Sequence, residues 1–225
     1  MALLMYGENG VTYKIFSKIF LWTYGEKKLL RILFKSAGIK QNIDKIQNMY
    51  MFWNFGKNAQ QKSVSCFGEP DVIITTKKYI FIVEVELLSI VKRIKSKNDA
   101  NLLKQLRRFY MLGRFFEEKL DNEVNARKIT PGKSAKVVMS GYKIGAALIP
   151  LQKYLKDFTG KKFYLISITK DSEKEVDVAK KILVSKIKDS NPDKIVVLPI
   201  SKLGKFQIAE EYKFTVFKRI RARPC

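Results

Sequence analysis

Three acidic side chains stand close together in a stretch that otherwise predicts two β-strands. Asp71 starts the first strand, and Glu84 and Glu86 lie within the second, over 80–87, after a polar turn at 76–79. Side chains alternate along a strand, so Glu84 and Glu86 share one face, and the hairpin folds Asp71 back beside Glu84. Carboxylates brought together repel, and a hard cation such as Mg²⁺ or Mn²⁺ relieves that repulsion. The alternative is an edge strand whose acids face water and pair with lysines.

A long amphipathic helix is expected after this hairpin, over 99–120, with an apolar stripe that includes Leu102, Leu106 and Phe109. Gln105 lies at the edge of that stripe, three residues after Leu102 and four before Phe109. It is therefore predicted to point toward the sheet. The alternative is an ordinary glutamine at the rim of a helix packing face.

An earlier helix is predicted over 24–38, ending at a glycine cap at Gly38. Glu26 precedes the leucines of this helix by three, four and seven positions, which places it on the expected buried face at the helix start. The alternative for Glu26 is a first-turn acid favoured by the helix dipole. Asp44 is the substitute candidate for the same role.

The motifs Pro70-Asp71 and Glu84-Val85-Glu86 resemble the signature of the PD-(D/E)xK nuclease superfamily, which has the restriction-endonuclease-like fold. In that family an acid on an opening helix precedes Pro-Asp, a hairpin and acid-x-Lys, and often a glutamine on the next helix. Glu86 stands where the family usually has lysine, and some restriction endonucleases of this fold carry Glu-x-Glu and remain active. The opening helix is similar to that of archaeal Holliday junction resolvases, and the whole chain to small nucleases of archaeal viruses.

This resemblance implies an α/β protein with an αβββαβ core, in which helices flank a central mixed sheet. It also implies a metal-dependent DNA endonuclease in which Asp71 and Glu84 bind Mg²⁺ or Mn²⁺ and Glu26 completes or extends the metal site. Glu86 would bind a second ion or orient the attacking water, and Gln105 would orient the water or a metal-bound oxygen. Cutting two strands or a junction needs two such sites, so a homodimer is expected.

The charge of the chain predicts a polyanionic partner. Lys and Arg number 44 against 21 Asp and Glu, which gives a net charge of +23 over 225 residues. When lysine and arginine side chains neutralise DNA phosphates, the counterions condensed on the DNA are released, and this release drives binding. One basic cluster, over 218–223, closes the chain. Two further clusters follow the acidic strand. Considered without that strand, each would be an ordinary solvated face. Because they stand beside the acids, we expect their side chains to contact phosphates: Lys92, Arg93, Lys95, Lys97, Arg107, Arg108 and Arg114.

Several classes of protein are excluded by what the sequence lacks. The chain has no histidine and two cysteines, Cys66 and Cys225, so Ser-His and Cys-His catalysis and a zinc cage are excluded. No apolar stretch approaches the roughly 20 residues that span a bilayer, and no secretory signal pattern opens the chain. The stretch 131–134 lacks the earlier glycine of a phosphate-binding loop, so no nucleotide cofactor is expected. An intracellular, cytoplasmic protein is predicted, in the host cytoplasm if the source is viral.

A single nuclease-like domain is expected over 1–225, with a helical N-terminal region over 1–60, a core over 61–200 and a basic C-terminal segment over 201–225. A strand, helix, strand order late in the core predicts a parallel crossover. The further elements expected are strands over 62–67, 72–75, 162–169 and 194–200 and helices over 146–158 and 172–190.

Two other functions are open at this point. The first is a nuclease-fold protein that binds DNA or a junction without cutting it, because Glu86 has replaced the lysine. The second is a basic RNA-binding or virion architectural protein in which the acids pair with lysines. The sequence leaves open which nucleic acid structure or sequence is recognised.

Overall fold

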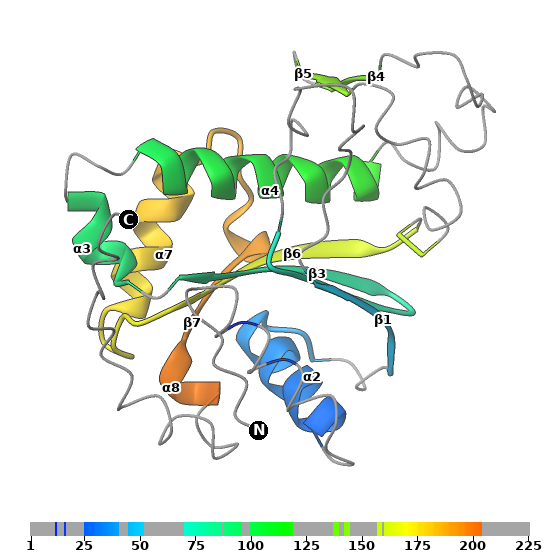
Figure 1. The fold of residues 1–225 in the computed structure, drawn as a ribbon, viewed down its shortest axis with the longest axis horizontal. Coiled ribbons are helices and arrows are strands. Elements are labelled where there is room, and N and C mark those ends of the chain that lie inside the picture. The colour runs from blue at the N-terminus through cyan, green and yellow to red at the C-terminus, as the bar shows by residue number, and fades with distance from the viewer. Residues whose placement is uncertain are drawn as a thin grey trace, which may run out of the picture.

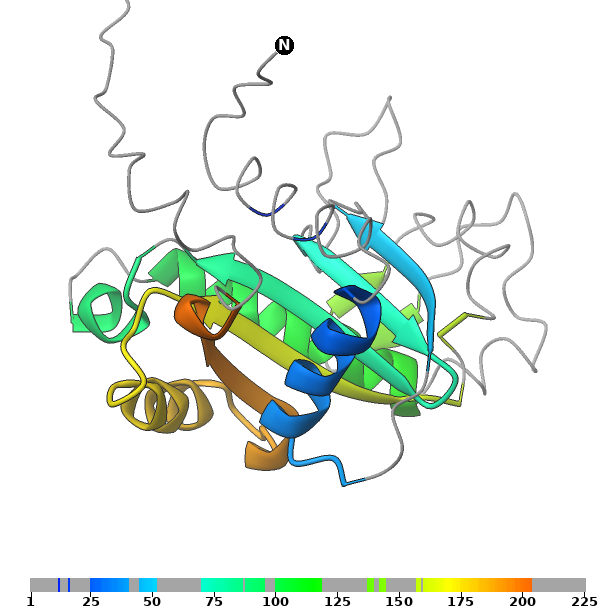
Figure 2. The ribbon, with the colours of Figure 1, turned by 90° about the horizontal axis from the view of Figure 1, so that it is seen from below.

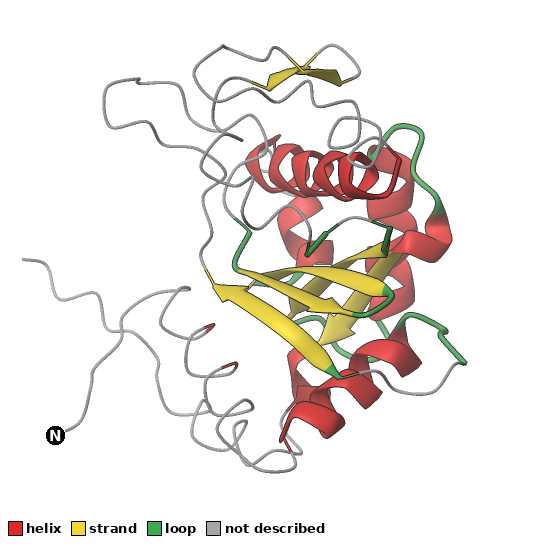
Figure 3. Ribbon diagram, turned by 90° about the vertical axis from the view of Figure 1, so that its right-hand side faces the viewer, coloured by secondary structure: helices red, strands yellow, loops and turns green. Residues whose placement is uncertain are grey.

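A five-stranded mixed sheet lies at the centre of the protein, and helices cover both of its faces (Figures 1 and 3). The computed structural model describes residues 12, 16, 25–40, 45–51, 70–86, 88–95, 100–118, 137–139, 142–144, 157–158 and 160–203. The predicted α/β class, with a central mixed sheet flanked by helices, is therefore confirmed.

The sheet combines an antiparallel meander with two parallel strands. Its members are β1 (Ile46–Met51), β2 (Val72–Thr76), β3 (Tyr79–Glu86), β6 (Lys162–Thr169) and β7 (Ile195–Pro199), in the spatial order β1-β2-β3-β6-β7. β2 is antiparallel to both β1 and β3, whereas β6 runs parallel to β3 and β7 runs parallel to β6. The carboxyl ends of β3, β6 and β7 therefore meet at one edge of the sheet.

Among the described residues, three helices cover one face of this sheet and two cover the other. The first set is α3 (Ile90–Lys95), α4 (Ala100–Glu118) and α7 (Val176–Lys186). The second set is α2 (Gly25–Ser36), which lies across the strands in Figure 2, and the short α8 (Ile200–Leu203). A 3-10 turn, η2 (Pro192–Lys194), precedes β7, and β4 (Val137–Met139) and β5 (Tyr142–Ile144) form a separate hairpin.

The alternation of side chains along β3 divides the interior into two hydrophobic cores. Ile80 and Ile82 pack with α4 and α7, whereas Phe81, Val83 and Val85 pack with α2. The strand is buried on both faces, as expected for a central strand of a sheet that is covered on both sides. Glu84 and Glu86 follow the alternation of Ile80 and Ile82, so they belong to the face that α4 covers.

Local signals in the sequence explain the ends of several elements. The turn between β2 and β3 is held by Thr76, whose Oγ1 accepts hydrogen bonds from the amides of Lys78 at 3.3 Å and Tyr79 at 3.0 Å. The predicted glycine cap of α2 is confirmed. Gly38 has a φ of +68°, and the amide of Ile39 donates to the carbonyl of Phe34 at 2.9 Å. This is a Schellman motif, for which a left-handed residue is required.

Several predicted boundaries need correction. The region 1–60, expected to be helical, contains strand β1, whose mixed sequence IQNMYM carries no clear strand pattern and becomes a strand by pairing with β2. The helix expected over 172–190 is confined to α7, because Ser172 and Glu175 form a capped turn ahead of it. The strand over 162–169 is confirmed with the same bounds as β6. The strand expected over 62–67 and the helix over 146–158 lie largely or wholly outside the described residues, and the single domain stays a prediction.

None of the helices in the part of the chain that the structure describes has the length and apolar character needed to cross a membrane.

Candidate acidic site

Two buried carboxylates lie next to each other at the start of β2 and near the end of β3. The register pairs Val72 with Val83, so the next step of the hairpin places Asp71 beside Glu84. Ile73 and Ile82 belong to the core under α4, and alternation puts Asp71 and Glu84 on that same face. Asp71 is 7% exposed and Glu84 is 6% exposed. The hairpin thus does bring these two predicted site residues together.

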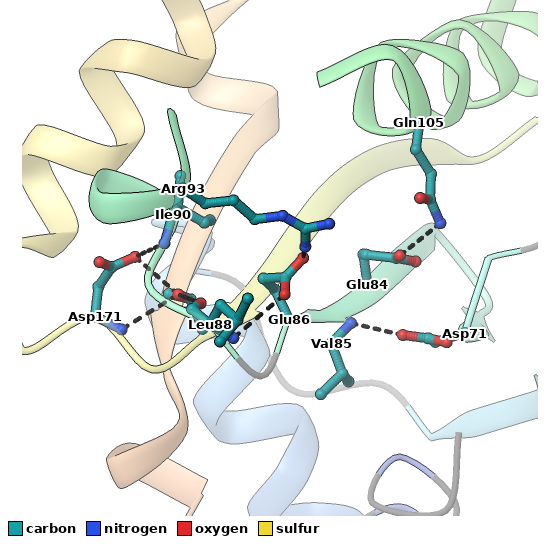
Figure 4. Close-up of polar contacts among 10 residues, drawn as sticks. Asp71, Glu84, Val85, Glu86, Leu88, Ile90, Arg93, Gln105 and Asp171 are labelled. Atoms are coloured by element: carbon teal, nitrogen blue, oxygen red, sulfur yellow. Dashed lines mark hydrogen bonds and ion pairs between the residues drawn. The ribbon is translucent and has the colours of Figure 1, made fainter. Parts of the chain in front are cut away.

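Neutral donors orient both of these carboxylates (Figure 4). The backbone amide of Val85 donates to Oδ2 of Asp71 at 2.8 Å. The side-chain amide of Gln105 reaches down from α4 and donates to Oε1 of Glu84 at 2.7 Å. The predicted direction of Gln105, toward the sheet, is confirmed. Such hydrogen bonds fix the direction of a carboxylate without cancelling its charge.

Glu86 lies on the same face but meets a different kind of partner. Arg93 of α3 forms an ion pair with its Oε2, and the amide of Leu88 donates to its Oε1 at 3.2 Å. The Glu86 side chain is 5% exposed, whereas that of Arg93 is 31% exposed. Figure 4 shows Glu86 directed toward Arg93, while Glu84 is directed toward Gln105. Glu86 therefore holds a basic side chain at the border between the interior and the surface.

Asp171, which sequence reasoning missed, lies two residues after the end of β6 and is 2% exposed. Its Oδ2 accepts a hydrogen bond from the amide of Ile90 at 2.7 Å, and its Oδ1 accepts one from the amide of Val91 at 3.3 Å. The hydroxyl of Ser89 also donates to Oδ1. The signal that would have found it is an acid within two residues of the end of an apolar strand, at the edge where the parallel strands end.

Two hydroxyl groups of β6 lie beside the acids of β3 and were also missed. The parallel register pairs Glu84 with Ser167 and Glu86 with Thr169. Thr169 Oγ1 lies 2.7 Å from Oδ2 of Asp171 and 3.1 Å from the carbonyl oxygen of Leu88. Ser167 Oγ is buried and has no hydrogen-bond partner within the described part of the chain. The face under α4 thus becomes polar toward the carboxyl ends of its strands.

The structure does not bring the three predicted carboxylates together as one metal-binding group. Across the described residues, no set of three or more Asp, Glu, His or Cys side chains is arranged to hold a metal ion. The pair Asp71 and Glu84 still offers hard oxygen ligands, and Mg²⁺ is commonly held by one or two carboxylates together with water and phosphate oxygens. This donor set therefore fits a magnesium ion, with Glu86 turned away to Arg93.

The other acids considered for this site are not placed with it. Glu26 lies in the first turn of α2, a helix that packs on the opposite face of the sheet, and its side chain lies outside the described residues. Asp44 lies outside them altogether. Their roles stay predictions.

The basic side chains expected to contact phosphates fall into three groups. Lys92 and Arg107 are exposed, and Arg108 is half-buried three residues after Gln105 on the same side of α4. Arg93 and Arg114 are paired with acids. The pair of Arg114 with Glu118 has distances of 2.9 and 3.0 Å, and its hydrogen bond raises the pKa of Arg114 above the ordinary value. The Lys95 side chain and all of Lys97 lie outside the described residues.

Comparison of the chain with models of known protein families, with curated proteins and with solved structures yields no match.

Proposed function

We propose that this protein is a metal-dependent DNA endonuclease that hydrolyses phosphodiester bonds. The observation that carries the proposal is the buried pair of Asp71 and Glu84, oriented by Val85 and Gln105 on a β-hairpin. The order of elements also supports it: with the short helix α3 and the separate β4–β5 hairpin set aside, α2, β1, β2, β3, α4 and β6 follow the αβββαβ order implied by the resemblance to PD-(D/E)xK nucleases.

The acid pair is the part of the site that would hold the metal. Burying two neighbouring carboxylates costs free energy, because each loses hydration and repels the other. A bound Mg²⁺ or Mn²⁺ offsets that cost, and it supplies both a more acidic water and charge compensation at the phosphate. The chain's own contribution is to hold Asp71 and Glu84 in fixed directions through the Val85 amide and the Gln105 side chain.

Arg93 is proposed to take the place of the lysine that the resemblance leads one to expect at position 86. Its guanidinium is held by Glu86, two residues after Glu84 on β3, and its side chain is partly exposed. A guanidinium presents several donors in a planar fork that suits phosphate oxygens. Arg93 would therefore neutralise charge on the phosphate under attack, with Glu86 as its orienting partner.

The remaining basic residues are proposed to bind the DNA backbone. Lys92 on α3 and Arg107 on α4 are exposed, and Arg108 on α4 is half-buried. Phosphate contacts of this kind position a duplex without reading its sequence. The net charge of +23 supports strong, salt-dependent binding. We further propose that the enzyme acts inside the cell as a homodimer, with two sites for the cutting of two strands or a junction.

A second function, DNA binding without cleavage, is favoured by one specific observation. Strand β3 carries Glu86 in place of a lysine, and because Glu86 is engaged by Arg93 it adds no third carboxylate to the acid pair in the described part of the chain. In this case the acid pair would stabilise the fold around a structural ion, and the basic residues alone would account for the activity of the protein.

A cleavage assay separates the two functions. Labelled linear, nicked, flapped and four-way-junction DNA is incubated with the protein in Mg²⁺, Mn²⁺ or EDTA, and DNA affinity is measured in EDTA. We expect cleavage of at least one substrate in Mg²⁺ or Mn²⁺ and none in EDTA. Tight binding to all substrates with no cleavage in either metal would contradict the nuclease and support the inert binder.

A further inference from the structure

A network centred on Asp171 joins the end of β6 to the start of α3 (Figure 4). Asp171 is buried, and it lies about 80 residues along the chain from the helix whose first amides it binds. Four donors approach its carboxylate: the amides of Ile90 and Val91 and the hydroxyls of Ser89 and Thr169. This carboxylate therefore holds the first turn of α3 against the sheet edge.

The same network determines where Arg93 lies. Ser89 Oγ accepts a hydrogen bond from the amide of Lys92 at 3.1 Å while its hydroxyl hydrogen is directed at Asp171. The amide of Arg93 donates to the carbonyl of Ser89 at 2.9 Å, which closes the first turn. Arg93 thus lies one helical turn after Ser89, whose hydroxyl donates to Asp171. From that position its side chain reaches Glu86 at the end of β3.

A helix of six residues needs no buried carboxylate from a distant strand merely to be capped. Ser89 already satisfies one of the first amides in the usual way. Asp171 binds the amides of Ile90 and Val91, and burying its carboxylate is costly unless such donors compensate it. Thr169 Oγ1 lies within hydrogen-bond distance of both the Leu88 carbonyl and the Asp171 carboxylate and donates its one hydrogen to either, at the connection that leads from β3 to α3.

We propose that Asp171 is a positioning residue that acts through Arg93: it fixes α3 so that the Arg93 guanidinium is held on Glu86, facing the phosphate site. This inference rests on the proposed function for its catalytic consequence, and on the observed contacts for the placement of Arg93. It predicts that loss of Asp171 and loss of Arg93 have the same effect on cleavage, because both remove one oriented guanidinium.

A double-mutant cycle tests this dependence. Single-turnover cleavage in Mg²⁺ is measured for the wild type, Asp171→Asn, Arg93→Ala and the double variant, at a temperature where circular dichroism shows all four folded. Residues that act through one another are non-additive. We expect each single variant to cut about tenfold more slowly than the wild type, and the double variant to be no slower than Arg93→Ala. Wild-type rates in Asp171→Asn, or multiplied losses in the double variant, would overturn the proposal.

A second measurement on the metal-free, DNA-free protein keeps the inference separate from the nuclease proposal. NMR of the arginine Nη–H groups reports whether the Arg93 guanidinium is held, through slowed exchange of these protons with water, because Nη1 is the atom that donates to Glu86. We expect Asp171→Asn to remove that protection, and the control Glu117→Gln, a carboxylate that binds Lys194 instead, to retain it. Protection that persists in Asp171→Asn contradicts the positioning role. A wild type that never cuts DNA, with protection lost as expected, contradicts only the nuclease.

Discussion

Glu84 and Glu86 stand two residues apart on the same face of one strand, and the structure gives them partners of opposite character. Glu84 is oriented by the neutral amide of Gln105, whereas Glu86 is joined to the cation of Arg93. A guanidinium and an amide are different kinds of hydrogen-bond donor to a carboxylate. In the proposed function, Asp71 and Glu84 would hold the metal, whereas Arg93, held by Glu86, would bind phosphate.

Gln105 offers a test of this division at the level of one hydrogen bond. Gln105→Met keeps the length of the side chain but removes the donor to Glu84. We expect cleavage to slow about tenfold while DNA affinity in EDTA stays unchanged, because the metal-binding carboxylate loses its orientation. The free energy of unfolding should fall by about 1 kcal/mol.

The control is Gln47→Met, the same chemical change at a glutamine on β1, away from the site. It removes the side-chain oxygen that accepts a hydrogen bond from Lys161. That variant should lose stability and keep its cleavage rate. Equal cleavage rates in Gln105→Met and the wild type would rule out an orienting role for Gln105.

Tyr164 is the residue for which a pH dependence of stability is expected. Burial raises the pKa of Tyr164 above its ordinary value of 10.0, and the neighbouring Tyr79, Glu117 and Asp193 raise it further. The folded state therefore binds the phenolic proton more tightly than the unfolded chain. The stability that neutral Tyr164 contributes is fully present below about pH 10 and is lost as pH rises through the folded pKa.

The measurement is the melting temperature between about pH 8 and pH 11 for the wild type and Tyr164→Phe. We expect the wild type to lose stability more steeply above pH 10 than the variant, because phenylalanine has no proton to lose. Parallel curves for the two proteins would show that Tyr164 does not cause the alkaline loss.

At the scale of elements, α4 and β6 hold the site together through a very close contact. A Cβ atom added at Gly113 would lie 2.1 Å from the ring of Phe163. Alanine normally favours a helix over glycine by about 1 kcal/mol, but a clash of this size forces the helix off the sheet. Because α4 also carries Gln105, the clash affects the site as well as the core.

We therefore expect Gly113→Ala to lower the free energy of unfolding by about 1–3 kcal/mol, measured from the urea midpoint. Asn101→Ala, an exposed position on the same helix, is the control and should leave the midpoint unchanged or raised. An unchanged midpoint in Gly113→Ala would mean that α4 and β6 are not packed as closely as the structure has them.

The elements that could be predicted from the sequence are those with strong local patterns. β6, the hairpin of β2 and β3, and α4 each have a clear apolar period, and Gly38 marks the end of α2. Strand β1 could not be predicted, because its residues become a strand only by pairing with β2. Within the site, Asp71, Glu84 and Gln105 follow from strand and helix periods, but the ion pair of Glu86 with Arg93 depends on how α3 is placed.

At the scale of the whole molecule, polar groups gather where the parallel strands end. Glu84 and Glu86 near the end of β3, Thr169 at the end of β6 and Asp171 beyond it all lie toward the same edge of the sheet. Open α/β sheets commonly bind their ligands outside the carboxyl ends of the strands. That edge, with the basic helices α3 and α4 beside it, is where we expect the DNA backbone to lie.

The most direct test of this account is single-turnover cleavage by Glu84→Gln, measured in Mg²⁺ on the substrate that the wild type cuts best. Glu117→Gln is the matched control, because it makes the same chemical change at an ion pair with Lys194. We expect Glu84→Gln to lose cleavage by about 100-fold or more while its DNA affinity in EDTA is retained, and Glu117→Gln to cut as the wild type does. Cleavage by Glu84→Gln at the wild-type rate, or wild-type cleavage that persists in EDTA, would contradict the account.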